Sequence, residues 1–235
     1  EYAGTGTPGD RTGGPTIFGR LADKYIRIFY GTATTVTLDR ITVSGGYLNA
    51  ASSQGGGLHF TGNSQVTLRQ CVVTNNLILA DWANQGGGLY INGGGLSIFD
   101  SAFVNDSVQK LSWATYSYGG AIFAQGAAVI VTNTLFTGNW TWPRHNDSYG
   151  GALLLDGGPA EIRDCRFTDN RAAVDGNADS PGRALGGVLF ATNVTSLTVE
   201  DCFFGSNRIP YFENVYGTER GGVLHVAGPA SRSVL

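Results

Sequence analysis

Residues 119–139 read GGAIFAQGAAVIVTNTLFTGN. This stretch opens with a glycine pair, alternates apolar with polar residues, and ends with Phe136 followed three positions later by Asn139. Apolar side chains at every second position predict β-strands that turn one face towards a core. The glycines and Asn133 between the alternating runs indicate turns, so the stretch predicts three short strands separated by tight corners.

The same pattern recurs along the chain at intervals of roughly 33 residues, which is typical of stacked repeat proteins. The glycine pairs begin at Gly55, Gly86, Gly119, Gly150, Gly186 and Gly221. A second motif, an aromatic residue or valine followed three positions later by Asn or Asp, ends at Asn76, Asp106, Asn139, Asn170 and Asn207. The two motifs alternate in constant order, so the chain is a tandem repeat.

One such repeat is too small to bury its own apolar face, whereas coils stacked at ~4.8 Å close a continuous core. We therefore predict an all-β fold, a right-handed single-stranded parallel β-helix (solenoid) of about six to seven coils with three strands each. Long loops are expected to leave one corner. Residues 26–235 are assigned to the β-helix, truncated or continuing at the C-terminus, and residues 1–25 to an N-terminal cap or a preceding-coil segment.

The Asn/Asp column has a structural interpretation. A buried amide costs several kcal/mol unless it is paired, but stacked amides can bond to one another and to the turn backbone. We expect a structural ladder rather than a ligand site at Asn76, Asp106, Asn139, Asn170 and Asn207.

Composition excludes some functions. Charged residues make up 14% of the chain and the formal net charge is −3, which leaves no electrostatic footprint for nucleic acid. No apolar run approaches the ~18 residues of a membrane span, so we predict no direct membrane insertion by this segment.

The motifs Gly119-Gly120-Ala121-Ile122 and Phe167-Thr168-Asp169-Asn170 resemble the repeats of polymorphic outer membrane proteins, the chlamydial adhesins. They are also similar to pectin-lyase-like β-helix repeats of algal and other surface proteins. The resemblance covers about residues 26–226 and implies surface display and adhesion rather than catalysis. This sequence departs from the pattern by lacking an autotransporter barrel, by using Val in early coils, and by carrying Asp106 in place of Asn.

Many right-handed β-helices are pectate lyases or polygalacturonases, so a polysaccharide-active lyase or hydrolase is an alternative. Such enzymes need clustered acids for calcium binding or acid–base work, whereas the acids here sit singly. We predict no catalytic residues and no cofactor. The one calcium-like spacing is Asp175, Asn177 and Asp179, but Ser180 takes the sixth position and no Glu takes the twelfth, so a solvated loop is favoured over Ca²⁺.

Three cysteines, Cys71, Cys165 and Cys202, fall in one column. Cys165 and Cys202 occupy neighbouring coils, which invites a disulfide. Stacked Cβ atoms near ~4.8 Å exceed the usual ~3.5–4.5 Å of a bridge, so free thiols are favoured.

Aromatic residues gather between the Asn column and the next glycine pair. They are Trp82, Trp113, Tyr116, Tyr118, Trp140, Trp142, Tyr149, Tyr211, Phe212 and Tyr216. Loops leaving one corner would form an aromatic flank. Its residues either pack on one another and on the solenoid or form a contact surface for another chain or a glycan.

Four Asn-x-Ser/Thr sequons favour a secreted or cell-surface glycoprotein. We expect glycosylation at Asn146, Asn193 and Asn105, whereas a glycan on Asn139 would contradict its place in the ladder. The leading hypothesis is a non-catalytic extracellular solenoid with a structural or adhesive role. Its partners would be further copies of itself, assembled end to end or laterally, or other surface proteins or glycans. A glycan-binding module using the aromatic loops is a further alternative.

Overall fold

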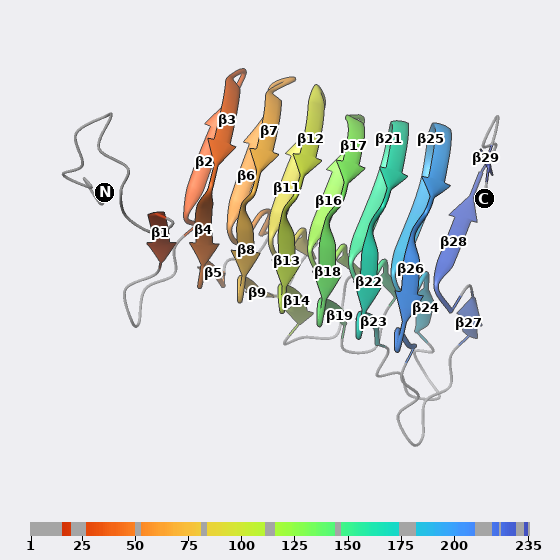
Figure 1. The fold of residues 1–235 in the computed structure, drawn as a ribbon. Coiled ribbons are helices and arrows are strands. Elements are labelled where there is room, and N and C mark those ends of the chain that lie inside the picture. The colour runs from red at the N-terminus through yellow and green to blue at the C-terminus, as the bar shows by residue number, and fades with distance from the viewer. Residues whose placement is uncertain are drawn as a thin grey trace, which may run out of the picture.

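The computed structural model describes residues 16–19, 27–49, 53–80, 84–110, 116–143, 147–173, 182–209, 218–220, 222–228 and 233–234. Successive coils of this part of the chain stack side by side along one axis (Figure 1). The fold is a right-handed parallel β-helix of about five turns, slightly fewer than predicted. The difference arises because the first and last coils carry only part of the strand set within the described ranges.

Five ladders of parallel strands build the stack. The first contains β2 (Phe29–Thr32), β6 (Leu58–Thr61), β11 (Leu89–Asn92), β16 (Ile122–Gln125), the first parts of β21 (Leu153–Arg163) and β25 (Leu189–Glu200), and β28 (Leu224–Ala227). The second contains β3 (Thr35–Asp39), β7 (Gln65–Arg69), β12 (Gly95–Phe99), β17 (Ala128–Thr132), the remainder of β21 and β25, and β29 (Ser233–Val234). The third contains β1 (Thr16–Gly19), β4 (Ile41–Ser44), β8 (Val72–Thr74), β13 (Ala102–Val104), β18 (Leu135–Thr137), β22 (Arg166–Thr168) and β26 (Phe203–Gly205).

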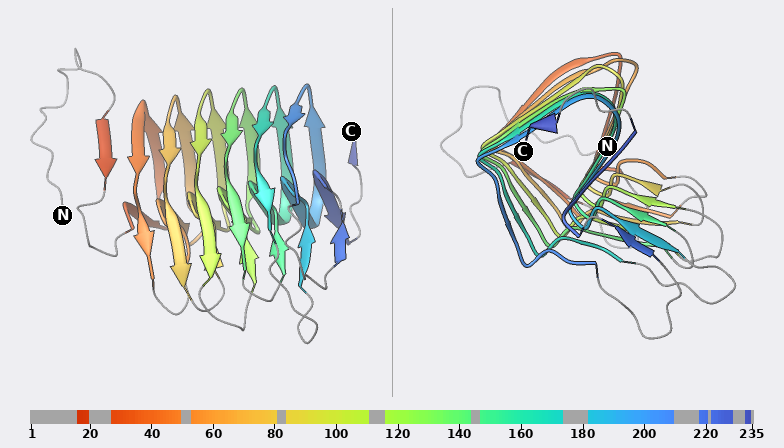
Figure 2. Two further views of the ribbon diagram at one scale, coloured as in Figure 1. Left: turned by 90° about the horizontal axis from the view of Figure 1, so that it is seen from below. Right: turned by 90° about the vertical axis from the view of Figure 1, so that its right-hand side faces the viewer.

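Segments expected to be loops carry two more ladders, which corrects the prediction of three strands per coil. The fourth contains β5 (Tyr47–Leu48), β9 (Leu77–Ala80), β14 (Ser107–Lys110), β19 (Trp140–Trp142) and β23 (Arg171–Ala172). The fifth contains β10 (Asn84–Gln85), β15 (Ser117–Tyr118), β20 (Ser148–Tyr149), β24 (Arg183–Leu185) and β27 (Thr218–Arg220). Seen along the axis, these strands form a lobe beside the main coil (Figure 2). The amide ladder explains these additional strands. It holds the start of each lobe segment in register with its neighbours, so the backbone groups that follow can pair.

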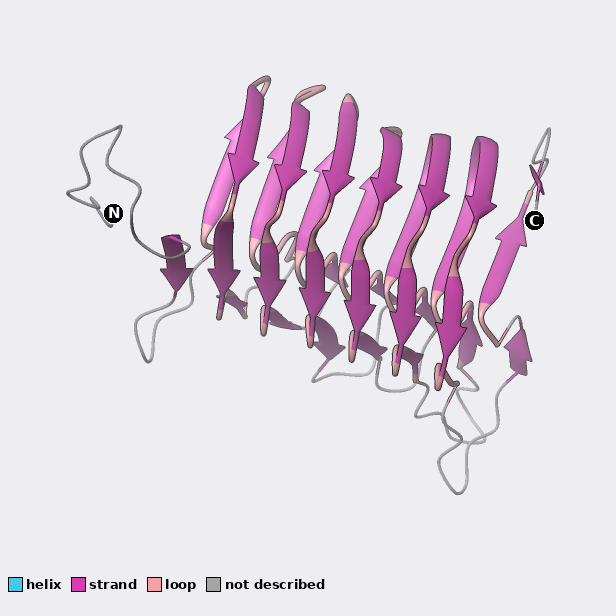
Figure 3. Ribbon diagram, viewed as in Figure 1, coloured by secondary structure: helices cyan, strands magenta, loops and turns pink. Residues whose placement is uncertain are grey.

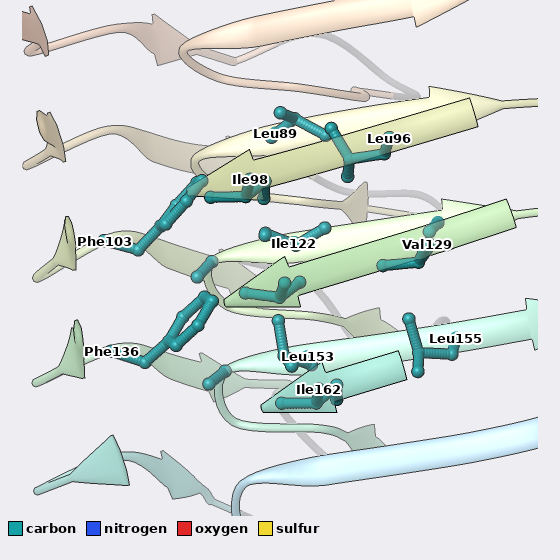
Figure 4. Close-up of a cluster of buried hydrophobic side chains, with 14 of the residues drawn as sticks. Leu89, Leu96, Ile98, Phe103, Ile122, Val129, Phe136, Leu153, Leu155 and Ile162 are labelled. Atoms are coloured by element: carbon teal, nitrogen blue, oxygen red, sulfur yellow. The ribbon is translucent and has the colours of Figure 1, made fainter. Parts of the chain in front are cut away.

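Every described element is a strand (Figure 3), and these residues include no helix long and apolar enough to cross a membrane. The core lies inside the first three ladders, where equivalent side chains stack coil upon coil (Figure 4). Phe136 stacks on Phe103 with ring centroids 5.2 Å apart and on Phe167 at 4.8 Å. Burying a side chain of this size contributes roughly 1.5–3 kcal/mol, so the column is a major source of stability.

The two glycines of each pair have different roles. The first adopts the left-handed backbone region, as Gly150 does with φ of 61°. The second lies against the next coil, because a Cβ atom on Gly151 would be 2.2 Å from the backbone oxygen of Gly187. The glycine pair therefore has a structural role, forming a tight corner between stacked coils rather than a ligand-binding loop.

Candidate functional site

The predicted amide ladder lies in the interior. Asn76, Asp106, Asn139 and Asn170 are all 0% exposed. The Asn139 Nδ2 donates to the Phe103 carbonyl oxygen (2.9 Å) and to the Asn170 Oδ1 (3.0 Å), and the Asn139 Oδ1 accepts from the Asp106 backbone N–H (3.0 Å). Asn207 continues the pattern, since its Nδ2 donates to the Phe167 carbonyl oxygen (2.9 Å). These bonds join successive coils, and both Nδ2 hydrogens of the buried Asn139 are used within the ladder.

Asp106 is the one carboxyl rung of this ladder. Its Oδ1 accepts from the backbone N–H and the Nδ2 of Asn76, at 2.9 and 2.8 Å. Its buried Oδ2 has no partner among the described residues. This oxygen takes the place that Nδ2 has in the amide rungs, since it lies against Gly88 as the Asn76 Nδ2 lies against Gly57. Burial raises the pKa of Asp106 to about 8, so the carboxyl is mostly neutral at pH 7.

The described members of the aromatic flank pack on one another and on the solenoid. Tyr118 and Tyr149 stack in the fifth ladder with centroids 5.2 Å apart, and Trp140 lies between Trp142 and Arg171. Trp140 and Trp142 belong to β19, so their predicted loop position is wrong. Tyr116 is the flank residue with a largely open ring, 41% exposed. The predicted flank residues outside the described ranges are Trp82, Trp113, Tyr211, Phe212 and Tyr216.

Beneath the tyrosines lies a second apolar cluster that the sequence analysis missed. Tyr90, Phe123, Leu154 and Phe190 point outward from the first ladder, yet each is at most 7% exposed. The fifth ladder covers them, with Tyr118 against Phe123 at 5.8 Å and Tyr149 against Phe190 at 4.9 Å. The signal was available, because uninterrupted apolar runs such as residues 153–155 indicate a strand buried on both faces.

A groove of about 380 Å³ opens where the first ladder emerges from under the fifth. Its lining residues are Gln85, Tyr118, Phe123, Gln125, Tyr149, Leu154, Asp156, Phe190, Thr192 and Asn193. Gln125, Asp156 and Thr192 occupy the same register position in three successive coils. We call this set of ten residues the groove.

The polar side of the groove centres on Asp156. Its Oδ1 accepts from the Asn193 Nδ2 at 3.0 Å and its Oδ2 from the Gln125 Nε2 at 3.5 Å. Gln125, Asp156 and Thr192 are half-buried and Asn193 is exposed, so their remaining hydrogen-bonding capacity faces solvent.

An ion pair between the buried Asp147 and the exposed Arg183 holds the aromatic edge of the groove. Asp147, 6% exposed, accepts from the Tyr149 hydroxyl (2.8 Å) and from the Arg183 Nε and Nη2 (3.0 and 2.6 Å). Burial raises the pKa of Tyr118 to about 12, helped by the charges of Asp147 and Asp156, and burial also raises the pKa of Tyr149. Both phenols are therefore neutral hydrogen-bonding groups at physiological pH.

The lining contains one carboxylate. Glycoside hydrolysis ordinarily uses two carboxyl groups on opposite sides of the scissile bond, and only Asp156 is present among these residues. No group of three or more His, Cys, Asp or Glu side chains among the described residues is arranged to hold a metal ion. The calcium candidates Asp175, Asn177 and Asp179 lie outside the described ranges.

The sequons divide by burial. Asn105 and Asn193 are exposed, with φ of 56° and 53° at their turns. Asn139 is fully buried with its Nδ2 donating twice, so a glycan there is incompatible with this ladder. Asn146 lies outside the described residues.

Comparison with known proteins agrees with the fold. The family described as the right-handed β-helix region matches residues 27–225, and the chain belongs to this family. No curated protein and no solved structure matches the chain. The family includes enzymes and non-enzymes, so membership leaves the activity open.

Proposed function

We propose that this protein is a non-catalytic, extracellular adhesive solenoid that binds a neutral glycan in the groove. The supporting observation is the composition of the groove, in which one carboxylate, three carboxamides and the Thr192 hydroxyl line its polar side above an apolar floor. Such a set recognises hydroxyl groups through neutral and charge-assisted hydrogen bonds but lacks a second acid for hydrolysis.

The shape of the groove favours an elongated ligand. Gln125, Asp156 and Thr192 repeat along the axis at the coil spacing of ~4.8 Å. A glycan chain lying parallel to the axis presents hydroxyl groups at a comparable repeat, so each coil would contact about one sugar. Phe123, Leu154 and Phe190, largely covered by the fifth ladder, would form the apolar floor beneath these sugars.

Charge favours a neutral glycan over an acidic one. Asp156 carries the formal charge of the lining, and no Lys or Arg lies among the ten groove residues. A uronate or sulfate group would meet this carboxylate without a compensating cation.

An extracellular location is supported by the sequons, of which Asn105 has an exposed side chain outside the groove. Adhesion within a larger surface assembly fits the apolar residues on the outer faces of the second and third ladders, where Ile130 is 42% and Phe203 50% exposed. Lateral contacts between copies would bury them. Negative-stain microscopy of the full-length protein that showed only dispersed monomers would argue against such an assembly.

The binding proposal is tested on a glycan array with the whole chain, followed by calorimetry with the best neutral oligosaccharide. Gln125→Ala removes one groove hydrogen bond and should weaken binding about tenfold, equivalent to ~1.4 kcal/mol. Gln65→Ala is the matched control, because Gln65 is an exposed glutamine on the second ladder outside the groove lining. Absence of glycan binding, or equal losses in both variants, would contradict the proposal.

The enzyme alternative is tested in the same samples. Reducing ends released from polysaccharides are measured for the unmodified chain and for Asp156→Asn. Cleavage that depends on Asp156 would replace the binding proposal with a catalytic one.

A further inference from the structure

One corner column of the solenoid makes the same hydrogen bond in five successive coils. Between the second and third ladders, a small side chain donates to the carbonyl oxygen two residues earlier. The pairs are Cys71 to Arg69 (3.2 Å), Ser101 to Phe99 (2.7 Å), Thr134 to Thr132 (2.9 Å), Cys165 to Arg163 (3.0 Å) and Cys202 to Glu200 (3.1 Å). Because Ser and Thr hydroxyls fill this role in two coils and Ile41 occupies the same column in an earlier coil, the corner does not require sulfur.

Cysteines nevertheless occupy two successive rungs of the column. Arg166 pairs with Phe203, and the Phe203 N–H donates to the Cys165 carbonyl oxygen at 2.8 Å, so Cys165 and Cys202 are direct neighbours in adjacent coils. Coils spaced by ~4.8 Å bring their Cα atoms within the ~4.4–6.8 Å that a disulfide spans. Closure needs the Cβ atoms to approach by roughly 0.3–1.3 Å, from the coil spacing of ~4.8 Å to the ~3.5–4.5 Å of a bridge.

The Cys202 Sγ faces the coil that carries Cys165, since it lies 3.7 Å from the Ile162 carbonyl oxygen. The Cys165 Sγ lies at the same distance from the Val131 carbonyl oxygen of the preceding coil. Cys71 differs, because the next rung of its column is Ser101, whose hydroxyl accepts from the Cys71 backbone N–H at 3.1 Å. The same column therefore supplies one thiol pair and one isolated thiol as an internal control.

The two thiols also differ in ionisation. The coupling between the two neighbouring thiols lowers the pKa of Cys202 below its ordinary value and raises that of Cys165. Cys202 is half-buried rather than fully buried, so a reagent can reach it. The nucleophile in thiol–disulfide exchange is the thiolate, which makes Cys202 the attacking group.

We propose that Cys165 and Cys202 form a redox-active dithiol that closes to a disulfide between two successive coils by exchange with a small external disulfide such as oxidised glutathione. The Cys202 thiolate attacks one sulfur of oxidised glutathione, forming a mixed disulfide and releasing one glutathione thiolate. The Cys165 thiol then loses its proton to solvent, attacks the Cys202 sulfur and releases the second glutathione. Overall, two protein thiols are oxidised and one glutathione disulfide is reduced to two thiols.

The bridge would join the coil of β21 to the coil of β25. Those strands also supply Asp156, Thr192 and Asn193 to the groove. Closing this cross-link restricts the unfolded chain, so the oxidised protein should unfold at a higher temperature than the reduced protein. The proposal does not depend on the groove binding a glycan.

The test uses the full chain equilibrated in reduced and in oxidised glutathione, acid-quenched, denatured, alkylated with N-ethylmaleimide and digested for mass spectrometry. In the oxidised sample we expect a linked peptide pair containing Cys165 and Cys202, lighter by two hydrogens, while Cys71 is alkylated. The thermal midpoint should rise by several degrees on oxidation.

Three variants make the test specific. Cys165→Ser and Cys202→Ser keep the corner hydrogen bond and should remove both the linked peptides and the shift in midpoint. Cys71→Ser should leave both unchanged. Full alkylation of Cys165 and Cys202 in the oxidised sample, or a bridge that includes Cys71, would overturn the proposal.

Discussion

The inner ladder and the outer groove use the same side chains, carboxamides and one carboxyl group, for different purposes. In the ladder, Asn139 is fully buried, and its Oδ1 and Nδ2 both form hydrogen bonds with neighbouring coils. In the groove, Asp156 is half-buried and accepts two bonds of the roughly four that a carboxylate can take. Burial thus separates a polar residue that holds the coils together from one that can meet a ligand.

The carboxyl groups sharpen this contrast. Asp106 sits in the ladder with one oxygen unpartnered among the described residues, whereas both oxygens of Asp156 have amide partners and solvent beside them. The causes that raise the pKa of Asp106 include no charged neighbour, since desolvation dominates and the bonds from Asn76 only oppose it. An aspartate in the ladder is therefore destabilising when it ionises, whereas an aspartate in the groove is a hydrogen-bond acceptor that solvent can reach.

The largest expected effect is a pH dependence of stability that originates at Asp106. Its pKa is about 8 when folded against an ordinary value of 3.8, so its stabilising contribution is fully present below pH 4. That contribution is lost as pH rises, because the unfolded chain releases the proton first, and the loss is complete above about pH 8. At 1.36 kcal/mol per pKa unit, the difference between 3.8 and about 8 corresponds to a loss of roughly 6 kcal/mol.

Asp106→Asn isolates this effect. The amide places a donor where Asn139 has one, so the variant should match the unmodified protein near pH 4 and exceed its free energy of unfolding increasingly up to pH 8. Urea titrations at several pH values measure the difference. A constant difference between the two proteins across this range would show that Asp106 ionises normally.

The next effect in size is the loss of one amide rung. Asn139→Ala leaves the Asp106 N–H, the Phe103 carbonyl and the Asn170 Oδ1 with a missing partner, and each such loss costs about 1–3 kcal/mol. We expect the free energy of unfolding to fall by about 3 kcal/mol, measured in urea. Asn92→Ala, at an exposed strand end, should change it by less than about 0.5 kcal/mol. Equal effects would mean that the ladder does not hold the coils together.

The sequence predicted the ladder and the inner columns because both depend on one repeated spacing. The spacing places Phe103, Phe136 and Phe167 on successive rungs, and their rings stack in that order. The groove was missed for a physical reason. It depends on how the fifth ladder lies across the outer face of the first, and the lobe segments that lead to it vary in length and lack the repeat. Two-residue strands such as β15 and β20 carry too little alternation to be recognised.

The smallest expected change in stability comes from the same substitution made in the groove. Asp156→Asn keeps the shape of a half-buried acceptor at the solvent edge and removes its charge, so we expect the free energy of unfolding to change by less than about 0.5 kcal/mol at any pH between 4 and 8. Its effect should instead appear in ligand choice, because the repulsion that disfavours uronates and sulfated sugars would be gone. Calorimetry with matched neutral and acidic oligosaccharides measures the preference. Two outcomes would contradict this comparison: a change in stability as large as that of Asp106→Asn, or an unchanged preference for neutral sugars. Either result would mean that burial does not separate the roles of Asp106 and Asp156.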